Sequence, residues 1–211
     1  MKWLLVASAS LLVITGSAAA QGCATYRNEL LRMREADEGI RSEWPAAMAS
    51  DDFANSRAVR MADVVDRKNT ANLKRLIARC GWPRPSAVGA DAAKGAWLIV
   101  QHADFDVPFQ TRVLSMLRQG FAKGGVDAEQ LALLEDRVAT AGDRPQIYGT
   151  QFEVVPPCGL KQLPVKDPAD VDKRRSKLGL MPLAEYKQKV AETILPQHCT
   201  APSSVSEATG K

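Results

Sequence analysis

An apolar run that ends abruptly in charged residues is the feature that most constrains the fold of this chain. Trp97 to Val100 is apolar on every side, as expected of a helix that passes through the middle of a domain. His102, Asp104 and Asp106 follow within a few residues. Polar groups held away from water need hydrogen-bond partners. We therefore expect distant parts of the chain to converge on this helix end, which suggests a site but specifies no reaction.

The first 20 residues have the features of a secretory signal peptide. Lys2 supplies the positive charge, residues 4–14 are apolar, and Ala18-Ala19-Ala20 is a small-residue cleavage site before Gln21. An uncleaved anchor and a lipoprotein attached through Cys23 are the alternatives. We expect an exported protein, periplasmic or secreted, with no membrane span in the mature chain because no later apolar stretch is long enough.

The remainder is long enough for one domain with a proper core, which we place at residues 21–199, followed by a flexible tail at 200–211. The formal net charge of +4 is too small to indicate a nucleic-acid partner.

Helical periodicity dominates most of the chain. We expect a first helix from Cys23 to about Ser42 and a second from about Ser56 to Arg79, ended by Gly81. The predicted apolar seam of the second helix is Met61, Val65, Leu73, Leu76 and Ile77. Near that seam, Asp66 and Asn69 either contact a neighbouring element, face a pocket, or form a wetted edge.

The four cysteines all lie in the exported part of the chain, where an even number favours two disulfides. If the first two helices form an antiparallel hairpin, Cys23 and Cys80 become neighbours, which leaves Cys158 to pair with Cys199. Their spacing does not favour a zinc site, because no two of them form a C-x-x-C pair.

The central helix is expected over residues 89–103, and two more helices follow it. Asp106 is a predicted N-cap for the first, which has Pro108 in its first turn, and Asp127 is a predicted N-cap for the second. From Gln146 the pattern alternates and favours a small β-hairpin within residues 146–165. Two short helices, beginning near Pro168 and Pro182, complete a mainly α fold of antiparallel or orthogonal helices.

Several short motifs occur in a fixed order: Gly81-Trp82-Pro83, Gln101-His102-Ala103-Asp104, Phe109-Gln110, Asp136-Arg137-Val138 and Gln146-x-Tyr148-Gly149-Thr150-Gln151. With the closing Asp167-Pro168, Val171-Asp172-x-Arg174-Arg175, Gly179-Leu180 and Glu185-Tyr186, they resemble a bacterial domain family of unknown function that is found in many exported proteins. The resemblance covers roughly residues 60–187. It implies a shared fold and a shared set of motifs, and no mechanism.

His102 is the candidate catalytic residue, and a purely structural role is the alternative. A lone imidazole on an apolar helix is commonly a satisfied core group that fixes packing. As a general acid or base it would be oriented by Asp104, Asp106 or Asp136, since a neighbouring carboxylate can tune an imidazole. No G-x-S-x-G elbow is present. A metal-independent acid–base hydrolase is therefore favoured over acyl-enzyme chemistry.

A metal site made of His102, Asp104 and Asp106 is a third interpretation. It lacks the second histidine of an H-E-x-x-H motif, and the predicted cap already gives Asp106 a structural role. We therefore expect neither a metal nor another cofactor.

Amide, guanidinium and phenol side chains form a candidate binding surface, because they recognise sugars, peptides or carboxylates by hydrogen bonding. The residues are Gln101, Gln110, Arg137, Gln146, Tyr148 and Gln151. Our leading prediction is a binding or interaction module for an unknown small molecule or peptide. Its polar cluster is expected around His102, between the central helix, the helix that carries Arg137, and the hairpin.

Overall fold

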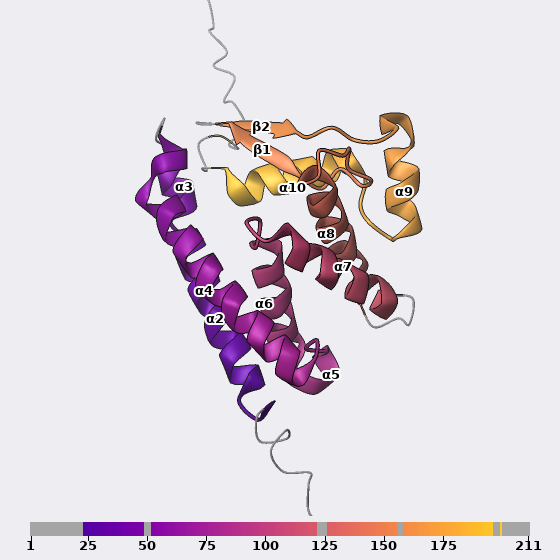
Figure 1. Ribbon diagram of the computed structural model, residues 1–211. Coiled ribbons are helices and arrows are strands. Elements are labelled where there is room, and N and C mark those ends of the chain that lie inside the picture. Colours follow the sequence, from indigo (N-terminus) through magenta and orange to yellow (C-terminus); the bar gives the residue numbers. More distant parts are fainter. Residues whose placement is uncertain (1–22, 49–51, 122–125, 156–157, 196–198, 200–211) are drawn as a thin grey trace, which may run out of the picture.

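The computed structural model describes residues 23–48, 52–121, 126–155, 158–195 and 199. The expected signal peptide and tail lie outside these residues. The described chain is mainly helical with one two-stranded antiparallel sheet, which confirms the predicted fold class (Figure 1). In chain order the elements are α2 (Tyr26–Arg41), α3 (Trp44–Ala47), η1 (Phe53–Asn55), α4 (Arg57–Cys80), α5 (Pro85–Val88), α6 (Ala90–Gln101), α7 (Val107–Phe121), α8 (Ala128–Thr140), β1 (Phe152–Val155), β2 (Gly159–Gln162), η2 (Pro168–Asp170), α9 (Val171–Lys177) and α10 (Leu183–Ile194).

Helices α2 and α4 lie side by side as the expected hairpin (Figure 1). A disulfide joins Cys23 to Cys80 at one end of the pair, and Asn69 of α4 donates a hydrogen bond to the Met33 carbonyl oxygen at 3.0 Å further along. A second disulfide joins Cys158 to Cys199. Both predicted pairings are confirmed. Two disulfides are compatible with an extracellular location.

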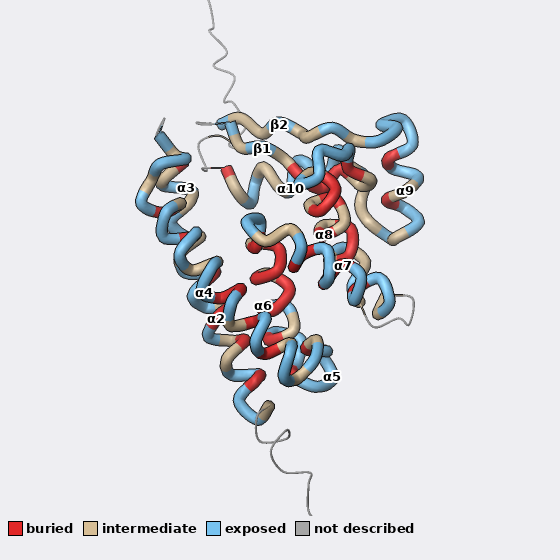
Figure 2. The backbone as a smooth tube through the Cα atoms, viewed as in Figure 1, coloured by how far each residue is buried: buried red, intermediate tan, exposed pale blue. Residues whose placement is uncertain are grey.

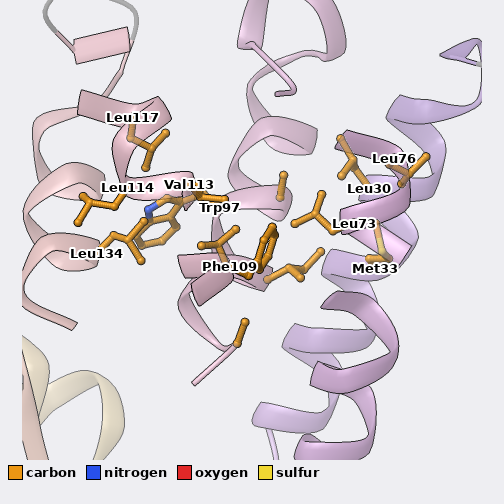
Figure 3. Close-up of a cluster of buried hydrophobic side chains, with 14 of the residues drawn as sticks. Leu30, Met33, Leu73, Leu76, Trp97, Phe109, Val113, Leu114, Leu117 and Leu134 are labelled. Atoms are coloured by element: carbon orange, nitrogen blue, oxygen red, sulfur yellow. The ribbon is translucent and has the colours of Figure 1, made fainter. Parts of the chain in front are cut away.

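The central helix of the sequence analysis is α6, and it lies at the centre of the fold. Figure 2 shows buried residues along most of its length. Trp97 and Phe109 lie between leucines of α7 and α8 on one side and apolar side chains of α2 and α4 on the other (Figure 3). One continuous core therefore surrounds the helix whose C-terminal end carries His102.

A glycine sets how closely α2 approaches α6. A Cβ atom at Gly95 would lie 2.9 Å from Cβ of Arg34 and 3.2 Å from the Leu30 carbonyl oxygen. These distances are shorter than ordinary van der Waals contact, so only glycine allows this packing. The close contact places the C-terminal half of α2 beside the end of α6.

The predicted seam of α4 is wrong by about one residue at its N-terminal end. Met61 is 38 % exposed, whereas Ala58 and Ala62 are buried. One residue on a helix corresponds to a rotation of about 100°, so the buried stripe runs through the two alanines. The prediction favoured the larger apolar side chain, but the fold buries the small ones.

The predicted caps of α7 and α8 are confirmed. The Phe109 amide donates to Oδ1 of Asp106 at 3.1 Å, and the Gln130 amide donates to Oδ1 of Asp127 at 2.9 Å. Asp106 also pairs with Lys74 of α4 at 2.7 Å, and this salt bridge lowers the pKa of its carboxyl group. The start of α7 is thereby tied to α4.

The sheet is shorter than the hairpin predicted from residues 146–165. β1 and β2 pair from Phe152 with Gln162 to Val155 with Gly159. Residues 146–151 form a loop instead of a strand, because the backbone amides of Tyr148, Thr150 and Gln151 bond to side chains, and Gly149 within the loop has a φ of +75°. Gln146 makes only an isolated bridge with Val165. Among the described residues, no helix combines the length and apolar character that a membrane crossing requires.

Candidate binding site

His102 is the first residue beyond α6, and its side chain contacts α2. Its Nδ1 lies 2.7 Å from Oδ1 of Asp37, whose side chain is only 2 % exposed. An ionised carboxylate can only accept a hydrogen bond, so Nδ1 carries the proton in this pair. The other ring nitrogen, Nε2, makes no hydrogen bond to a described residue. The carboxylate in contact with His102 is thus that of Asp37, rather than that of Asp104, Asp106 or Asp136.

Arg41 joins this pair to α4. Its guanidinium donates to Oδ1 of Asp37 at 2.8 Å and to Oδ2 of Asp66 at 2.7 Å. Burial raises the pKa of the Asp66 carboxyl group despite the opposing effect of Arg41. We refer to Asp37, Arg41, Asp66 and His102 as the His102 cluster. With a neutral imidazole, its two carboxylates and one guanidinium leave one negative charge.

The His102 cluster forms part of the wall of a cavity of about 610 Å³, which we call the His102 pocket. Arg41, Asp66 and His102 contribute to its lining, and α10 contributes Ile194. Most of the remaining wall is apolar and comes from Trp44, Pro45, Met48, Val59, Ala62 and Phe105. This combination of an apolar wall and a few polar groups is typical of sites that bind small molecules.

Three polar atoms of pocket-lining residues have no hydrogen-bond partner within the described part of the chain. They are Nε of Arg41, Nε1 of Trp44 and Oδ1 of Asp66. Buried polar atoms are nearly always paired, and each unpaired one costs about 1–3 kcal/mol. These atoms have almost no surface of their own open to the cavity, so they mark incomplete hydrogen bonding within the wall of the pocket.

Four of the predicted site residues gather around the C-terminal end of α6. Nη1 of Arg137 donates to both carboxylate oxygens of Asp104, at 2.9 and 2.7 Å, and Nε donates to Oε1 of Gln101 at 3.1 Å. Nε2 of Gln110 donates to Asp104 at 3.1 Å and to the Val100 carbonyl oxygen at 3.0 Å. Asp104 and Arg137 also line the His102 pocket, so the structure brings them together with His102.

The other predicted site residues form a separate group centred on Asp136. This fully buried carboxylate accepts hydrogen bonds from the backbone amides of Ile147, Tyr148 and Thr150 and from the Thr150 hydroxyl. Burial raises the pKa of the Asp136 carboxyl group, although these donors act in the opposite direction. Asp136 therefore anchors the loop that leads to the hairpin.

Two glutamines complete this group. Nε2 of Gln146 donates to the carbonyl oxygens of Gln151 and Leu163, and its Oε1 accepts from the Gln151 amide at 2.6 Å. Nε2 of Gln151 donates to the Leu133 carbonyl oxygen and to the Thr150 hydroxyl. We call Asp136, Gln146, Thr150 and Gln151 the Asp136 cluster. Asp136, Gln146 and Tyr148 are not among the residues that line the His102 pocket.

The model of a family of unknown function (DUF6624) matches residues 24–194 of the chain. The chain belongs to this family. The match spans the described helices from α2 to α10 and includes both clusters. No curated protein and no solved structure matches the chain.

In this DUF6624 chain, one group of side chains has the spacing of metal ligands. Single ligand atoms of Asp37, Asp66 and His102 all lie within 4.8 Å of one another. The Arg41 guanidinium contacts both carboxylates, so a cation already bridges them. The metal site considered from sequence, made of His102, Asp104 and Asp106, is not such a group. Asp104 pairs with Arg137, and Asp106 pairs with Lys74.

Sequence analysis of this DUF6624 member did not identify Asp37 and Arg41 as site residues. Both lie on a helix with many charged residues, where their four-residue spacing resembles an ordinary surface pair. Asp66 carried a signal, because it interrupts an apolar stripe, and a pocket was one of the explanations considered. The contact that distinguishes these explanations is the one between Asp66 and Arg41, which lies 25 residues away in the sequence.

Proposed function

We propose that this DUF6624 chain is a binding module that holds a small molecule with a largely apolar body in the His102 pocket. The observation that carries the proposal is a mostly apolar cavity whose wall also includes the polar side chains of Arg41, His102 and Arg137. A cavity of about 610 Å³ lies within the usual size range of ligand sites. The apolar wall would supply affinity, and the polar atoms would orient the ligand.

A matched pair of substitutions on α4 tests the proposal. Val59 lines the His102 pocket, whereas Val64 is 56 % exposed. We expect ligand-observed NMR with a library of aliphatic and aromatic fragments to find compounds that bind the unmodified chain and Val64→Trp. The same compounds should lose binding in Val59→Trp, because the indole fills the cavity. Fragments that bind all three proteins equally, or no bound fragment at all, would refute the pocket.

A metal-independent hydrolase is the second candidate, and the Asp37–His102 contact supports it. A buried carboxylate that fixes Nδ1 leaves Nε2 free to accept a proton from a water or substrate hydroxyl in the pocket. In this proposal Asp37 orients His102, and Arg41 holds Asp37 in place. Asp104 is not required, because its carboxylate contacts Arg137.

Chromogenic ester, amide and phosphoester substrates test this second candidate. If the chain hydrolyses any of them, His102→Gln should reduce kcat by about 10²–10⁴-fold, the usual contribution of a general acid–base group. Asp37→Asn should reduce kcat as well, because it changes the hydrogen bond that holds the imidazole. Equal turnover by the unmodified chain and His102→Gln would assign the activity to another site or a contaminant.

We also propose that the chain is exported, with residues 1–20 as its signal peptide. The charge and apolar pattern of that segment supports the proposal, as do two disulfides of the kind formed in oxidising compartments. Cell fractionation would test it. When residues 1–211 are expressed, the protein should be found outside the cytoplasm with its N-terminus near Gln21. Deletion of residues 2–20 should keep the protein in the cytoplasm.

A further inference from the structure

Two cavities of the chain meet near the C-terminal end of α10. Arg137, Thr193 and Ile194 line the His102 pocket and also a second cavity of about 340 Å³. The lining of the second cavity includes the polar side chains of Gln151 and Lys189. Arg137 therefore lies at a boundary between the mostly apolar His102 pocket and a more polar cavity.

The guanidinium of Arg137 is only partly used by the fold. Its Nε donates to Gln101 and its Nη1 donates to Asp104, whereas its Nη2 makes no hydrogen bond to a described residue. The Arg137 side chain is 27 % exposed, so solvent or a ligand can reach it. Arginine suits carboxylates in particular, because its parallel N–H groups match the two oxygens.

The two arginines of the pocket differ in how easily they can exchange partners. Arg41 bonds to Asp37 and Asp66, whose side chains are 2 % and 12 % exposed, and breaking such a pair is strongly unfavourable. Arg137 bonds to Asp104, whose side chain is 63 % exposed and can return to water. Exposed ion pairs are worth little. Gln110 also donates to Asp104, but it keeps its bond to the Val100 carbonyl oxygen when Asp104 moves away. A ligand carboxylate can therefore replace Asp104 on Arg137 at small cost.

On the basis of the proposed function, we infer that the ligand is an amphiphilic monocarboxylate. Its carboxylate pairs with Arg137 at the boundary between the two cavities, and its apolar body lies in the His102 pocket against Trp44, Met48 and Phe105. Lys189 lies in the lining on the other side of Arg137 and adds a second positive charge there. In the absence of ligand, Asp104 holds the guanidinium in position.

Isothermal calorimetry with octanoate and octan-1-ol tests this inference, because the two probes share the alkyl chain and differ in charge. We expect the unmodified chain to bind octanoate more tightly than octan-1-ol. Arg137→Met should weaken octanoate binding by about 10-fold or more, the usual effect of losing a charge-assisted pair. It should weaken octan-1-ol binding much less, because the alcohol carries no charge. Arg118→Met, on α7 and outside the lining of both cavities, should bind like the unmodified chain.

Asp104→Asn gives the sharper result, and it does so even if Arg137→Met fails to fold. Removal of the competing carboxylate should tighten octanoate binding by about 2–5-fold, the scale of an exposed ion pair. A purely structural pair predicts no gain, so unchanged or weaker octanoate binding in Asp104→Asn would overturn the inference. Equal binding of octanoate and octan-1-ol would overturn the inference that the ligand carries a carboxylate, but it would support an apolar ligand in the His102 pocket. If neither probe binds, this inference fails, and the Val59→Trp experiment decides the proposed function separately.

Discussion

The His102 cluster and the Asp136 cluster each contain a buried aspartate, but they differ in how fully their polar atoms are paired. Asp136 accepts hydrogen bonds from three backbone amides and one hydroxyl. Within the described chain, no buried side-chain atom of the Asp136 cluster lacks a partner. In the His102 cluster, Arg41 and Asp66 each retain an unpaired atom beside a cavity.

This difference separates structural polar networks from candidate sites. A network in which every polar atom is paired rigidifies its surroundings and needs no ligand to complete its hydrogen bonds. An incomplete network lowers stability, and a molecule in the adjacent cavity can complete it only if the side chains shift toward it. A buried carboxylate alone does not distinguish the two cases, since Asp37 and Asp136 are both buried.

The largest effect should come from Asp136→Ala. The substitution leaves the amides of Ile147, Tyr148 and Thr150 buried without their acceptor, and we expect a loss of about 3–5 kcal/mol in the free energy of unfolding. Urea denaturation followed by circular dichroism measures it. Asp91→Ala is the control, because its carboxylate is 78 % exposed in a surface pair with Arg34 and should change stability by less than about 1 kcal/mol. If the two variants are equally stable, the Asp136 cluster is not an anchor.

His102→Ala should have a smaller effect on stability and a large one on binding. Asp37 loses one hydrogen bond but keeps Arg41, so we expect a loss of about 1–2 kcal/mol in the free energy of unfolding. Fragments that bind the His102 pocket should bind the variant more weakly, as NMR titration of the folded protein would show. A stability loss as large as that of Asp136→Ala, with unchanged fragment binding, would place the imidazole among the structural groups.

Local features of the fold could be predicted from sequence, and the long-range partners of the site could not. The caps at Asp106 and Asp127 depend on nearby residues. The Cys23–Cys80 disulfide required only correct helix ends, and Cys158–Cys199 was the pair that remained. The Asp37–His102 contact depends on α2 approaching α6 at Gly95, and no periodicity encodes that approach. The loop at 146–151 resembled a strand, because the alternation of its side chains does not reveal that Asp136 captures its amides.

Asp106→Ala should have an effect of about 1 kcal/mol, the usual value of an N-cap. The salt bridge with Lys74 lowers the pKa of the Asp106 carboxyl group in the folded state. A lowered folded pKa means that the stabilisation is complete above the unfolded value of 3.8 and is lost as the pH falls through the folded value. The difference in stability between the unmodified chain and Asp106→Ala should therefore shrink in acid. Urea denaturation at several pH values would show it, and a constant difference would contradict the ionised cap.

The smallest and most diagnostic effect is the change in the stability of Asp66→Asn with pH, because its direction differs between a structural cluster and an incomplete site. Burial raises the folded pKa of Asp66 above its ordinary value of 3.8. A raised folded pKa means that its contribution to stability is fully present below 3.8 and is lost as the pH rises through the folded value. Asparagine stays neutral, so the stability of Asp66→Asn relative to the unmodified chain should improve from acid to neutral pH.

Asp63→Asn, on the same helix with a 53 % exposed side chain, is the control and should not follow this trend. If Asp66→Asn instead becomes less stable, relative to the unmodified chain, as the pH rises, then Arg41 fully compensates the carboxylate, and the His102 cluster is as complete as the Asp136 cluster.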